Sequence, residues 1–185
     1  MRYFRKMIGE RVYLSPMNED DAETYANWLN DRAVSENLGL YRDNISLASE
    51  RSHLARMTAE GHNYAIVAID GDALIGNTSL MEVHGVNRRA TLGIFIGEAS
   101  MRGKGYGAEA IRLLLRYGFD TLNLHNIMLN VNSDNAQAIA CYKKAGFAEF
   151  GRRRESTYKD GRYVDTLYME ILEGEFRGKY PIGGA

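Results

Sequence analysis

The sequence predicts one α/β (α+β) domain with a mixed, mostly antiparallel sheet of about seven strands and about four helices. Seven segments carry the alternating or continuous apolar pattern of strands, and four carry the apolar stripe of helices. Turn signals between consecutive strands favour antiparallel pairing, while the strand–helix–strand passage through residues 90–132 predicts one parallel pair. At 185 residues, 45% of them apolar, the chain has the size of one domain, and we expect residues 1–185 to form it.

In the first half of the chain, turn and cap residues separate the predicted elements. These elements are, in order, a strand at 11–17, a helix capped by Asn18, a loop at 33–45, a helix beginning at Ser46, and strands at 63–69 and 73–83. Asp70-Gly71 between the last two strands is a strong hairpin signal.

In the second half, a glycine-rich break divides a central strand from a helix. The predicted elements are a strand at 90–97, a helix ending near Phe119, a strand at 126–132, a helix at 134–145, and strands at 147–158 and 162–172. Gly146 is placed to end the second of these helices. Residues 173–185 are expected to form a short C-terminal tail.

Composition excludes several classes of protein. Lysine and arginine total 23 against 24 acidic residues, so a nucleic-acid partner is not expected. Cys141 is the only cysteine, which rules out an intrachain disulfide and a zinc ribbon, and the four histidines show no i,i+4 pair, so no metal is expected. The sequence has no apolar run of roughly 20 residues and no leader-like start. We therefore expect a cytoplasmic protein with no membrane partner.

The glycine-rich break is the first candidate binding site. It consists of Arg102, Gly103, Lys104, Gly105, Tyr106 and Gly107. Three glycines in five residues leave the backbone amides open, and at a helix N-terminus these amides can converge on an anion. Arg102 and Lys104 add positive charge, so the predicted ligand is a phosphate or pyrophosphate. The alternative is a tight turn that needs glycine only for a positive φ.

Other phosphate motifs fit this break less well. A Walker A loop is absent. A dinucleotide fingerprint matches Gly103, Gly105 and Ala108, but it lies past the midpoint of the chain, after antiparallel hairpins and with one crossover left. This position disfavours a nicotinamide-binding protein.

The helix predicted at 134–145 carries a second candidate set. Asn135 and Tyr142 are seven residues apart, so they lie on nearly one face, roughly 10.5 Å apart along the helix axis. Ala138 lies between them and leaves a shallow groove suited to an extended ligand. The alternatives are a first-turn polar residue for Asn135 and a tyrosine closing the core for Tyr142.

Together these motifs carry a family resemblance. Arg-x-x-Gly-x-Gly after a strand, followed by Asn-x-x-Ala-x-x-x-Tyr-x-x-x-Gly-Phe, resembles the GCN5-related N-acetyltransferases, the GNAT superfamily, over residues 10–172. The opening GERVYLSPMNEDDAETYANWLND resembles the branch of ribosomal-protein N-terminal acetyltransferases. The segments NLHNIMLNV and DGRY are similar to spermidine N-acetyltransferases of that branch.

The resemblance implies a sheet splayed between its fourth and fifth strands, with acetyl-coenzyme A (acetyl-CoA) in the gap. It also implies direct transfer of an acetyl group to a primary amine. The implied coenzyme-binding residues are Phe95, Ile96 and Gly97 for the pantetheine arm, residues 102–107 for the pyrophosphate, and Asn135, Ala138 and Tyr142 on the following helix. The resemblance makes Tyr142 the general acid that protonates the leaving thiolate, and its ordinary pKa of about 10 suits that role.

The general base is less clearly marked. Glu82 and His84 lie two residues apart on a predicted strand and should share one face. We take Glu82 as the candidate base; the alternative is that both residues form a solvated strand edge. Cys141 could suggest an acyl-enzyme, but it points about 100° away from Tyr142 around the helix and is expected to be a packed residue.

The acceptor is predicted from the loop after the first helix. Polyamine acetyltransferases that resemble this chain carry a neighbouring glutamate pair there, whereas SENLGLYRDNIS has Glu36, Arg42 and Asp43. A peptide or protein N-terminus, or a small amino compound, is therefore the expected acceptor. The alternatives are a polyamine acetyltransferase and a non-catalytic acyl-CoA-binding sensor. A homodimer or larger homo-oligomer stays open.

Overall fold

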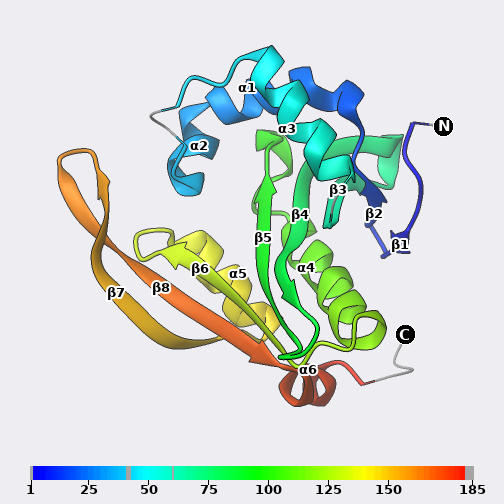
Figure 1. Cartoon of the computed structure of the whole chain (residues 1–185), viewed down its shortest axis with the longest axis vertical. Coiled ribbons are helices and arrows are strands. Elements are labelled where there is room, and N and C mark those ends of the chain that lie inside the picture. Colours follow the sequence, from blue (N-terminus) through cyan, green and yellow to red (C-terminus); the bar gives the residue numbers. More distant parts are fainter. Residues whose placement is uncertain (1, 41–42, 60, 182–185) are drawn as a thin grey trace. The chain divides into compact units, whose positions relative to one another are not determined.

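The computed structural model describes residues 2–40, 43–59 and 61–181, and Figure 1 shows their elements along the chain. Within these residues, eight strands form a sheet in the order β1-β2-β3-β4-β5-β6-β8-β7, and six α-helices accompany it. The predicted mixed, mostly antiparallel α/β sheet is confirmed. It has eight strands in place of about seven and six α-helices in place of about four.

The chain packs into two compact units. The first unit comprises Met1–Ser79 and Ile94–Leu113, and the second comprises Leu80–Gly93 and Leu114–Ala185. The chain passes between the units inside β4 (Ala73–His84), β5 (Arg89–Ile96) and α4 (Tyr106–Arg116).

The strands of the first unit pair as the apolar pattern predicts. β2 (Val12–Pro16) runs antiparallel to β3 (His62–Ala68), with Leu14 opposite Ile66. β1 (Met7–Ile8) pairs antiparallel with β2 at the edge of the sheet. The sequence did not predict β1, because two residues are too few to show an alternating pattern.

Two of the helices in the first unit were predicted. They are α1 (Ala22–Asn30) and α3 (Leu47–Ala59), and Tyr25 and Leu54 from their apolar sides share one buried cluster. Asn18 does act as a cap, but its side chain closes a short 3₁₀ turn that leads into α1.

The prediction of a loop at 33–45 was wrong for its first part, because the structure has a helix there, α2 (Arg32–Leu38). The Asp31 side chain accepts a hydrogen bond from the Ala33 amide at 3.0 Å and so caps the helix. Only Val34 and Ser35 of α2 are buried. A helix with so few buried residues shows no apolar stripe, which is why the sequence pattern missed it.

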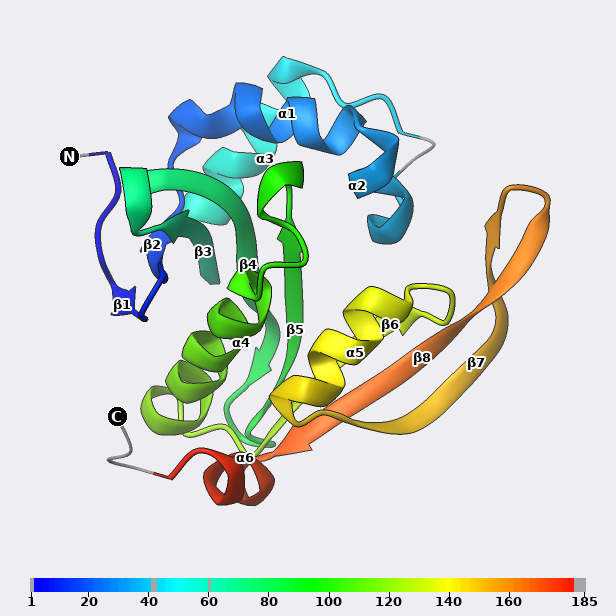
Figure 2. The ribbon, with the colours of Figure 1, turned by 180° about the vertical axis from the view of Figure 1, so that it is seen from behind.

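The second unit contains the predicted parallel pair. β5 pairs with β6 (Asn126–Asn132) in parallel, with Arg89–Thr91 opposite Asn126–Met128. β6 is also antiparallel to β8 (Arg162–Leu172), which forms the last hairpin with β7 (Ala148–Lys159) as predicted. Figure 2 shows this long hairpin from behind.

α5 (Ala136–Ala145) ends at Gly146, which adopts the left-handed conformation that the sequence predicted. Beyond β8, the tail predicted at 173–185 begins instead with α6 (Glu173–Lys179). Phe176 of α6 is buried, and its ring lies 5.2 Å from that of Phe119. One buried side chain in seven residues gives no readable helical period, so α6 was not predicted.

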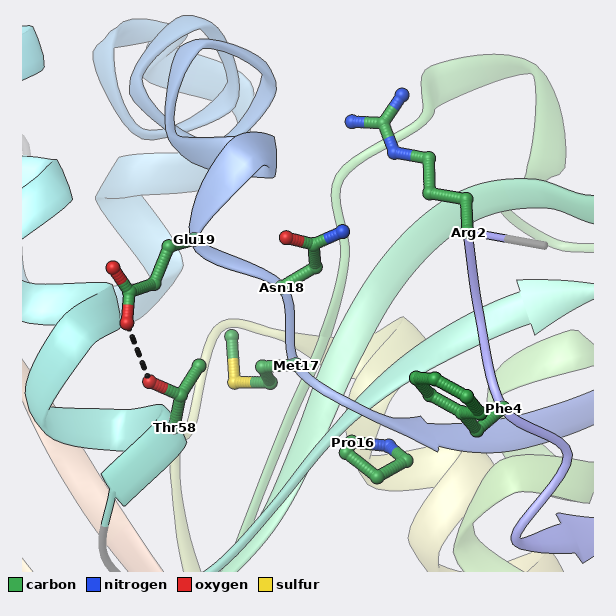
Figure 3. A pocket seen from close by; sticks show the side chains of 7 residues that line it. All are labelled: Arg2, Phe4, Pro16, Met17, Asn18, Glu19 and Thr58. Atoms are coloured by element: carbon green, nitrogen blue, oxygen red, sulfur yellow. Dashed lines mark hydrogen bonds between the residues drawn. The ribbon is translucent and has the colours of Figure 1, made fainter.

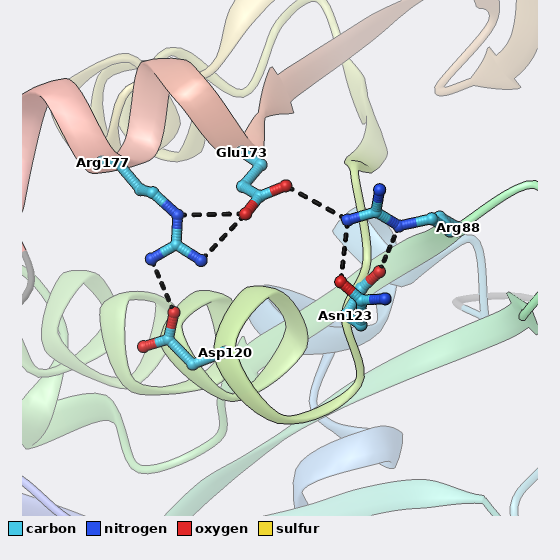
Figure 4. A network of polar contacts seen from close by, with 5 residues as sticks. All are labelled: Arg88, Asp120, Asn123, Glu173 and Arg177. Atoms are coloured by element: carbon cyan, nitrogen blue, oxygen red, sulfur yellow. Dashed lines mark hydrogen bonds and ion pairs between the residues drawn. The ribbon is translucent and has the colours of Figure 1, made fainter.

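A polar network holds α6 in place, as Figure 4 shows. Arg177 donates hydrogen bonds to Glu173 and Asp120, and Arg88 donates to Glu173 and to Asn123. These contacts join α6 to the turns before β5 and β6, which are far away in sequence.

Every helix among the described residues falls short of the length and apolar character that crossing a membrane would require.

Candidate active site

The end of β5 in the first unit carries three of the predicted residues, Phe95, Ile96 and Gly97. The Phe95 ring lies 6.2 Å from the rings of both Tyr25 and Trp28, in edge-to-face contacts. Gly97 lies directly against Trp28, since a Cβ on Gly97 would be 2.1 Å from Trp28 Cδ2. Gly97 is therefore required for a close approach. The sequence placed Trp28 on an apolar stripe but gave no sign that it meets residue 97.

Arg102 lies beside this strand end rather than pointing away from it. Its Nε donates to the Ile96 carbonyl at 3.0 Å, and its Nη2 donates to the Gly97 carbonyl at 2.6 Å. The sequence predicts that Arg102 adds positive charge to an anion site. In the structure its side chain also ties the turn to the last residues of the strand.

The glycine-rich turn leads directly into α4, which begins at Tyr106. Gly105 has φ +88°, a left-handed conformation that strongly favours glycine, and Gly103 has φ +72°. Gly103, Lys104 and Gly105 are exposed. The positive-φ explanation is therefore confirmed at two positions, and it is compatible with anion binding at the helix N-terminus.

Two residues that the sequence analysis did not select support this turn. The buried carboxylate of Glu109 accepts hydrogen bonds from the Arg11 and Val12 amides, at 2.8 and 3.3 Å. Arg11 Nη1 donates to the Lys104 carbonyl at 2.9 Å. Arg11 and Glu109 are 98 positions apart, and no sequence motif links residues at such a distance.

Glu109 is an ionised buried acid. Burial by itself would raise the pKa of this carboxyl group, but the backbone amides of the hairpin tip and the Arg11 side chain outweigh it and hold the pKa below its usual value. A carboxylate with so many donors is a fixed structural charge rather than a proton carrier.

Asn135 and Tyr142 lie at the two ends of α5 in the second unit. Asn135 is the N-cap, and its Oδ1 accepts a hydrogen bond from the Ala138 amide at 3.1 Å. The first-turn role that the sequence left open is thus confirmed. Capping uses one oxygen of the side chain, so it does not exclude a ligand at the amide nitrogen.

Tyr142 is half-buried, and its ring lies 6.1 Å from that of Phe147. Burial raises the pKa of Tyr142 to about 12, which corrects the ordinary value expected from the sequence. The phenol keeps its proton throughout the physiological pH range.

The neighbouring Cys141 is half-buried, and burial raises the pKa of its thiol. Such a thiol is a poor nucleophile.

Glu82 and His84 occupy the exposed end of β4. Glu82 has φ +51°, which breaks the alternation of the strand, so the inference that the two side chains share a face does not hold. Glu82 Oε2 accepts a hydrogen bond from Thr91 Oγ1 at 3.1 Å, and His84 Nδ1 accepts one from the Asn87 amide at 3.0 Å. His84 therefore stabilises the turn after β4.

The two acidic residues that are expected near the acceptor, Glu36 and Asp43, are seven positions apart in the sequence. Glu36 is half-buried, and its Oε2 lies 3.7 Å from Arg32 Nε on the same helix. Asp43 is exposed, and Arg42 lies outside the described residues.

A surface pocket of about 330 Å³, shown in Figure 3, lies elsewhere in the first unit and includes none of the predicted site residues.

The described residues contain no group of three or more His, Cys, Asp or Glu side chains that could hold a metal ion.

Comparison with known proteins decides the family. A family model described as an acetyltransferase (GNAT) domain matches residues 11–148. The chain belongs to the GNAT acetyltransferase family. It is therefore an acetyl-CoA-dependent N-acetyltransferase, and the resemblance seen in the sequence is confirmed.

Both branches noted in the sequence are represented among the relatives of this acetyltransferase. The spermidine N(1)-acetyltransferase of Vibrio cholerae is 37% identical over 56% of this chain and 59% of its own length. The putative ribosomal N-acetyltransferase YdaF of Bacillus subtilis is 32% identical over 58% of each chain. The matched part thus spans about three fifths of the length of these two relatives.

A solved structure extends the similarity to nearly the whole chain. The spermidine N-acetyltransferase from Vibrio cholerae in complex with CoA and spermine matches with a TM-score of 0.80 and 26% identity, over 91% of this chain and 99% of that one.

Proposed function

We propose that this acetyltransferase transfers the acetyl group directly to a primary amine with few positive charges, such as a peptide or protein N-terminus or a small amino compound. One observation carries the choice of acceptor. The Glu36 carboxylate in the segment after α1 lies near Arg32, which partly offsets its charge, and Asp43 is not adjacent to it in sequence. Holding several ammonium groups at once requires several uncompensated carboxylates.

A polyamine acceptor is the second candidate. It is favoured by the 37% identity to a spermidine N(1)-acetyltransferase and by the similarity to a structure with CoA and spermine. The segment after α1 argues against it, because it lacks the neighbouring glutamate pair that the family resemblance implies for a polyamine acceptor.

Two groups of residues are proposed to bind the coenzyme. In the first unit they are Phe95, Ile96 and Gly97 at the strand end and Arg102, Gly103, Lys104, Gly105, Tyr106 and Gly107 in the turn; in the second they are Asn135, Ala138 and Tyr142. The positive φ of Gly105 and the exposed backbone of the turn support the first group. For the second, support comes from the capped α5, which holds Asn135 and Tyr142 at fixed spacing.

Tyr142 is proposed as the general acid. Its pKa of about 12 keeps the phenol protonated, which an acid requires before the reaction begins. An ordinary thiol has a pKa of about 8.5, so a thiolate in water would take this proton reluctantly. The same poorly solvated surroundings that raise the pKa of the phenol would also raise that of a thiolate formed beside it, and this brings the two values closer.

Glu82 is kept as the proposed base, acting directly or through water on the incoming ammonium group. Its carboxylate is exposed, and its contact with Thr91 Oγ1 orients it. His84 is the weaker candidate because its Nδ1 already accepts the Asn87 amide hydrogen.

The test is a panel of acceptors at equal concentration. Peptides that begin with alanine or serine, several amino acids and spermidine would be compared by release of free CoA from acetyl-CoA. We expect kcat/KM to be higher for at least one peptide or small amine than for spermidine. A value for spermidine well above all others would overturn the proposed acceptor and support the polyamine candidate. No thiol release with any of these amines, despite coenzyme binding, would exclude all of them as acceptors and overturn the proposed acceptor class.

The oligomeric state is proposed to be a homodimer or larger homo-oligomer. The β7–β8 hairpin exposes Phe150, Tyr158 and Tyr163, with exposed fractions of 53%, 47% and 63%. The rings of Tyr158 and Tyr163 lie together, with their centroids 5.0 Å apart, and a contiguous exposed apolar patch can mark an interface. Light scattering after size exclusion would show a monomer mass if this proposal is wrong.

A further inference from the structure

We propose that the tip of the β1–β2 hairpin belongs to the coenzyme site, with Arg11 and Glu109 acting as positioning residues for the glycine-rich turn. Through them the N-terminal hairpin would set the backbone shape that receives the pyrophosphate of CoA. This inference rests on the proposed role of residues 102–107.

Glu109 anchors the start of α4 to the tip of the β1–β2 hairpin. Glu109 belongs to the first turn of α4, directly after the glycine-rich turn, and its side chain is 4% exposed. Its carboxylate accepts hydrogen bonds from the amides of Arg11 and Val12. The start of α4 is thereby fixed to the hairpin tip by an ionised acid that is almost fully removed from water.

The Arg11 side chain bridges Glu109 and the glycine-rich turn. Arg11 Nε donates to Glu109 Oε2 at 3.2 Å, and Arg11 Nη1 donates to the Lys104 carbonyl at 2.9 Å. The guanidinium group also lies over the Tyr106 ring, with Cζ 5.0 Å from its centroid. One planar side chain therefore contacts three consecutive parts of the turn and helix, and a lysine could not make all of these contacts at once.

Little space remains around the side chains of Arg11 and Glu109. A Cβ on Gly105 would lie 3.0 Å from Arg11 Nη2, and a Cβ on Gly9 would lie 2.3 Å from Glu109 Oε1. The glycines of the turn and of the hairpin tip thus allow Arg11 and Glu109 to fit between them. A side chain at position 105 would therefore have to displace the Arg11 guanidinium in addition to adopting a φ of +88°.

The functional consequence follows from exposure. Gly103, Lys104 and Gly105 are exposed, so the turn has little buried apolar surface to hold its shape. A flexible anion site must be ordered when the ligand binds, and that cost weakens affinity. By tying the Lys104 carbonyl to a buried carboxylate, Arg11 lowers this cost before CoA arrives.

The chain offers a matched control in the same N-terminal segment. Arg5 Nη2 lies 3.2 Å from Asp72 Oδ1, and Arg5 Cζ lies 5.0 Å from the centroid of the Tyr13 ring. The side chain of Arg5 is 44% exposed and that of Arg11 is 49% exposed. Arg5 thus has the same kinds of partner and similar exposure but no contact with the turn. Arg5→Met removes the same kinds of contact away from the proposed site, although the Asp72 side chain is 59% exposed and that of Glu109 only 4%.

The experiment measures the dissociation constants of CoA and of pantetheine, which lacks the pyrophosphate and nucleotide. Calorimetry would be done with the full chain and with Arg11→Met, Arg11→Lys and Arg5→Met. We expect Arg11→Met to weaken CoA binding by about 10-fold, the loss typical of a charged hydrogen bond. Pantetheine binding should be unchanged, Arg11→Lys should lie in between, and Arg5→Met should match the wild type for both ligands.

The outcomes separate this inference from the proposed function. If the wild type prefers CoA and Arg11→Met keeps that preference, the positioning role is wrong while the pyrophosphate assignment stands. If the wild type binds CoA and pantetheine equally, the pyrophosphate assignment itself fails. An equal loss for both ligands would show a general structural role and would also overturn the inference. Should Arg11→Met not fold, Arg11→Lys and Glu109→Gln decide the question by the same ratio.

Discussion

The glycine-rich turn of the first unit and α5 of the second unit differ in what fixes their shape. α5 is determined locally: Asn135 caps it through the amide of Ala138, and Gly146 ends it, all within twelve residues. The turn depends on residues far away in the chain, since Arg11 reaches Lys104 across 93 positions. Local contacts can be predicted from a sequence motif, whereas distant ones require the fold. The mutations below test whether this difference extends to function.

The largest effect is expected at the locally determined site. Tyr142→Phe keeps the ring and its packing beside Phe147 but removes the phenolic proton. Turnover should fall by roughly 10²- to 10⁴-fold, the usual contribution of a general acid, while CoA affinity stays nearly the same. Because burial raises the pKa of Tyr142 to about 12, titration of this group should not lower the wild-type rate below about pH 11. Steady-state turnover that is unchanged under chemistry-limited conditions would remove Tyr142 from the mechanism.

The next effect is expected at the turn. Gly105→Glu places a side chain where φ is +88° and where a Cβ would already lie 3.0 Å from Arg11 Nη2, and it adds a negative charge. We expect CoA binding to weaken by about 100-fold or more, measured by calorimetry, because strain, displacement of Arg11 and repulsion of the pyrophosphate act together.

Gly71→Glu is the control for that variant. Gly71 also has a positive φ, +75°, but nothing lies within 4 Å of the position of its Cβ. It therefore reproduces the backbone strain and the charge without disturbing the turn. CoA affinity in Gly105→Glu equal to that of the wild type, or to that of Gly71→Glu, would show that residues 102–107 are not the pyrophosphate site.

The same contrast explains what the sequence could predict. The strand at 126–132 and the end of α5 at Gly146 were predicted correctly, because their patterns lie within one element. The short helices α2 and α6 bury too few side chains to show a period. Within the site, the alternation rule failed at Glu82, where a left-handed residue interrupts the strand. A left-handed residue inside a strand leaves no clear mark in the sequence.

The sequence also failed to predict contacts between segments that are far apart along the chain. Trp28 against Gly97, and Arg11 against Gly105, each join residues that no motif connects. In both cases the glycine was visible in the sequence, but the side chain that requires it was not. A glycine in a site motif therefore indicates a close approach without naming the partner.

A smaller effect is expected from Asn135, where a structural and a binding role can be separated. Asn135→Ala removes the cap and should lower the free energy of unfolding by about 1 kcal/mol. Asn135→Asp keeps an oxygen for the Ala138 amide and should retain most of that stability, but it loses the amide nitrogen. If Asn135 binds the pantetheine arm, CoA affinity should fall in both variants. A fall in Asn135→Ala alone would assign this residue to capping and exclude it from the ligand site.

The smallest effect is expected next to Tyr142. Cys141 directly precedes Tyr142 on α5, so its side chain points about 100° away from that of Tyr142 around the helix axis. Burial raises the pKa of its thiol, and Lys144 opposes this shift without overcoming it, so the thiol stays neutral near pH 7. Direct transfer needs no nucleophile on the enzyme. Cys141→Ala should change kcat by less than about 2-fold, since a neutral thiol contributes little to nucleophilic catalysis.

Two measurements with the wild type test the same point. Direct transfer requires both substrates on the enzyme together, so initial rates should show intersecting double-reciprocal plots rather than the parallel lines of a ping-pong mechanism. Mass spectrometry after mixing the protein with acetyl-CoA alone should show no acetylated Cys141. An acetyl group on that sulfur, together with inactivity of Cys141→Ala, would replace direct transfer by an acyl-enzyme. It would also mean that bound coenzyme alters the surroundings of the thiol enough to lower its pKa.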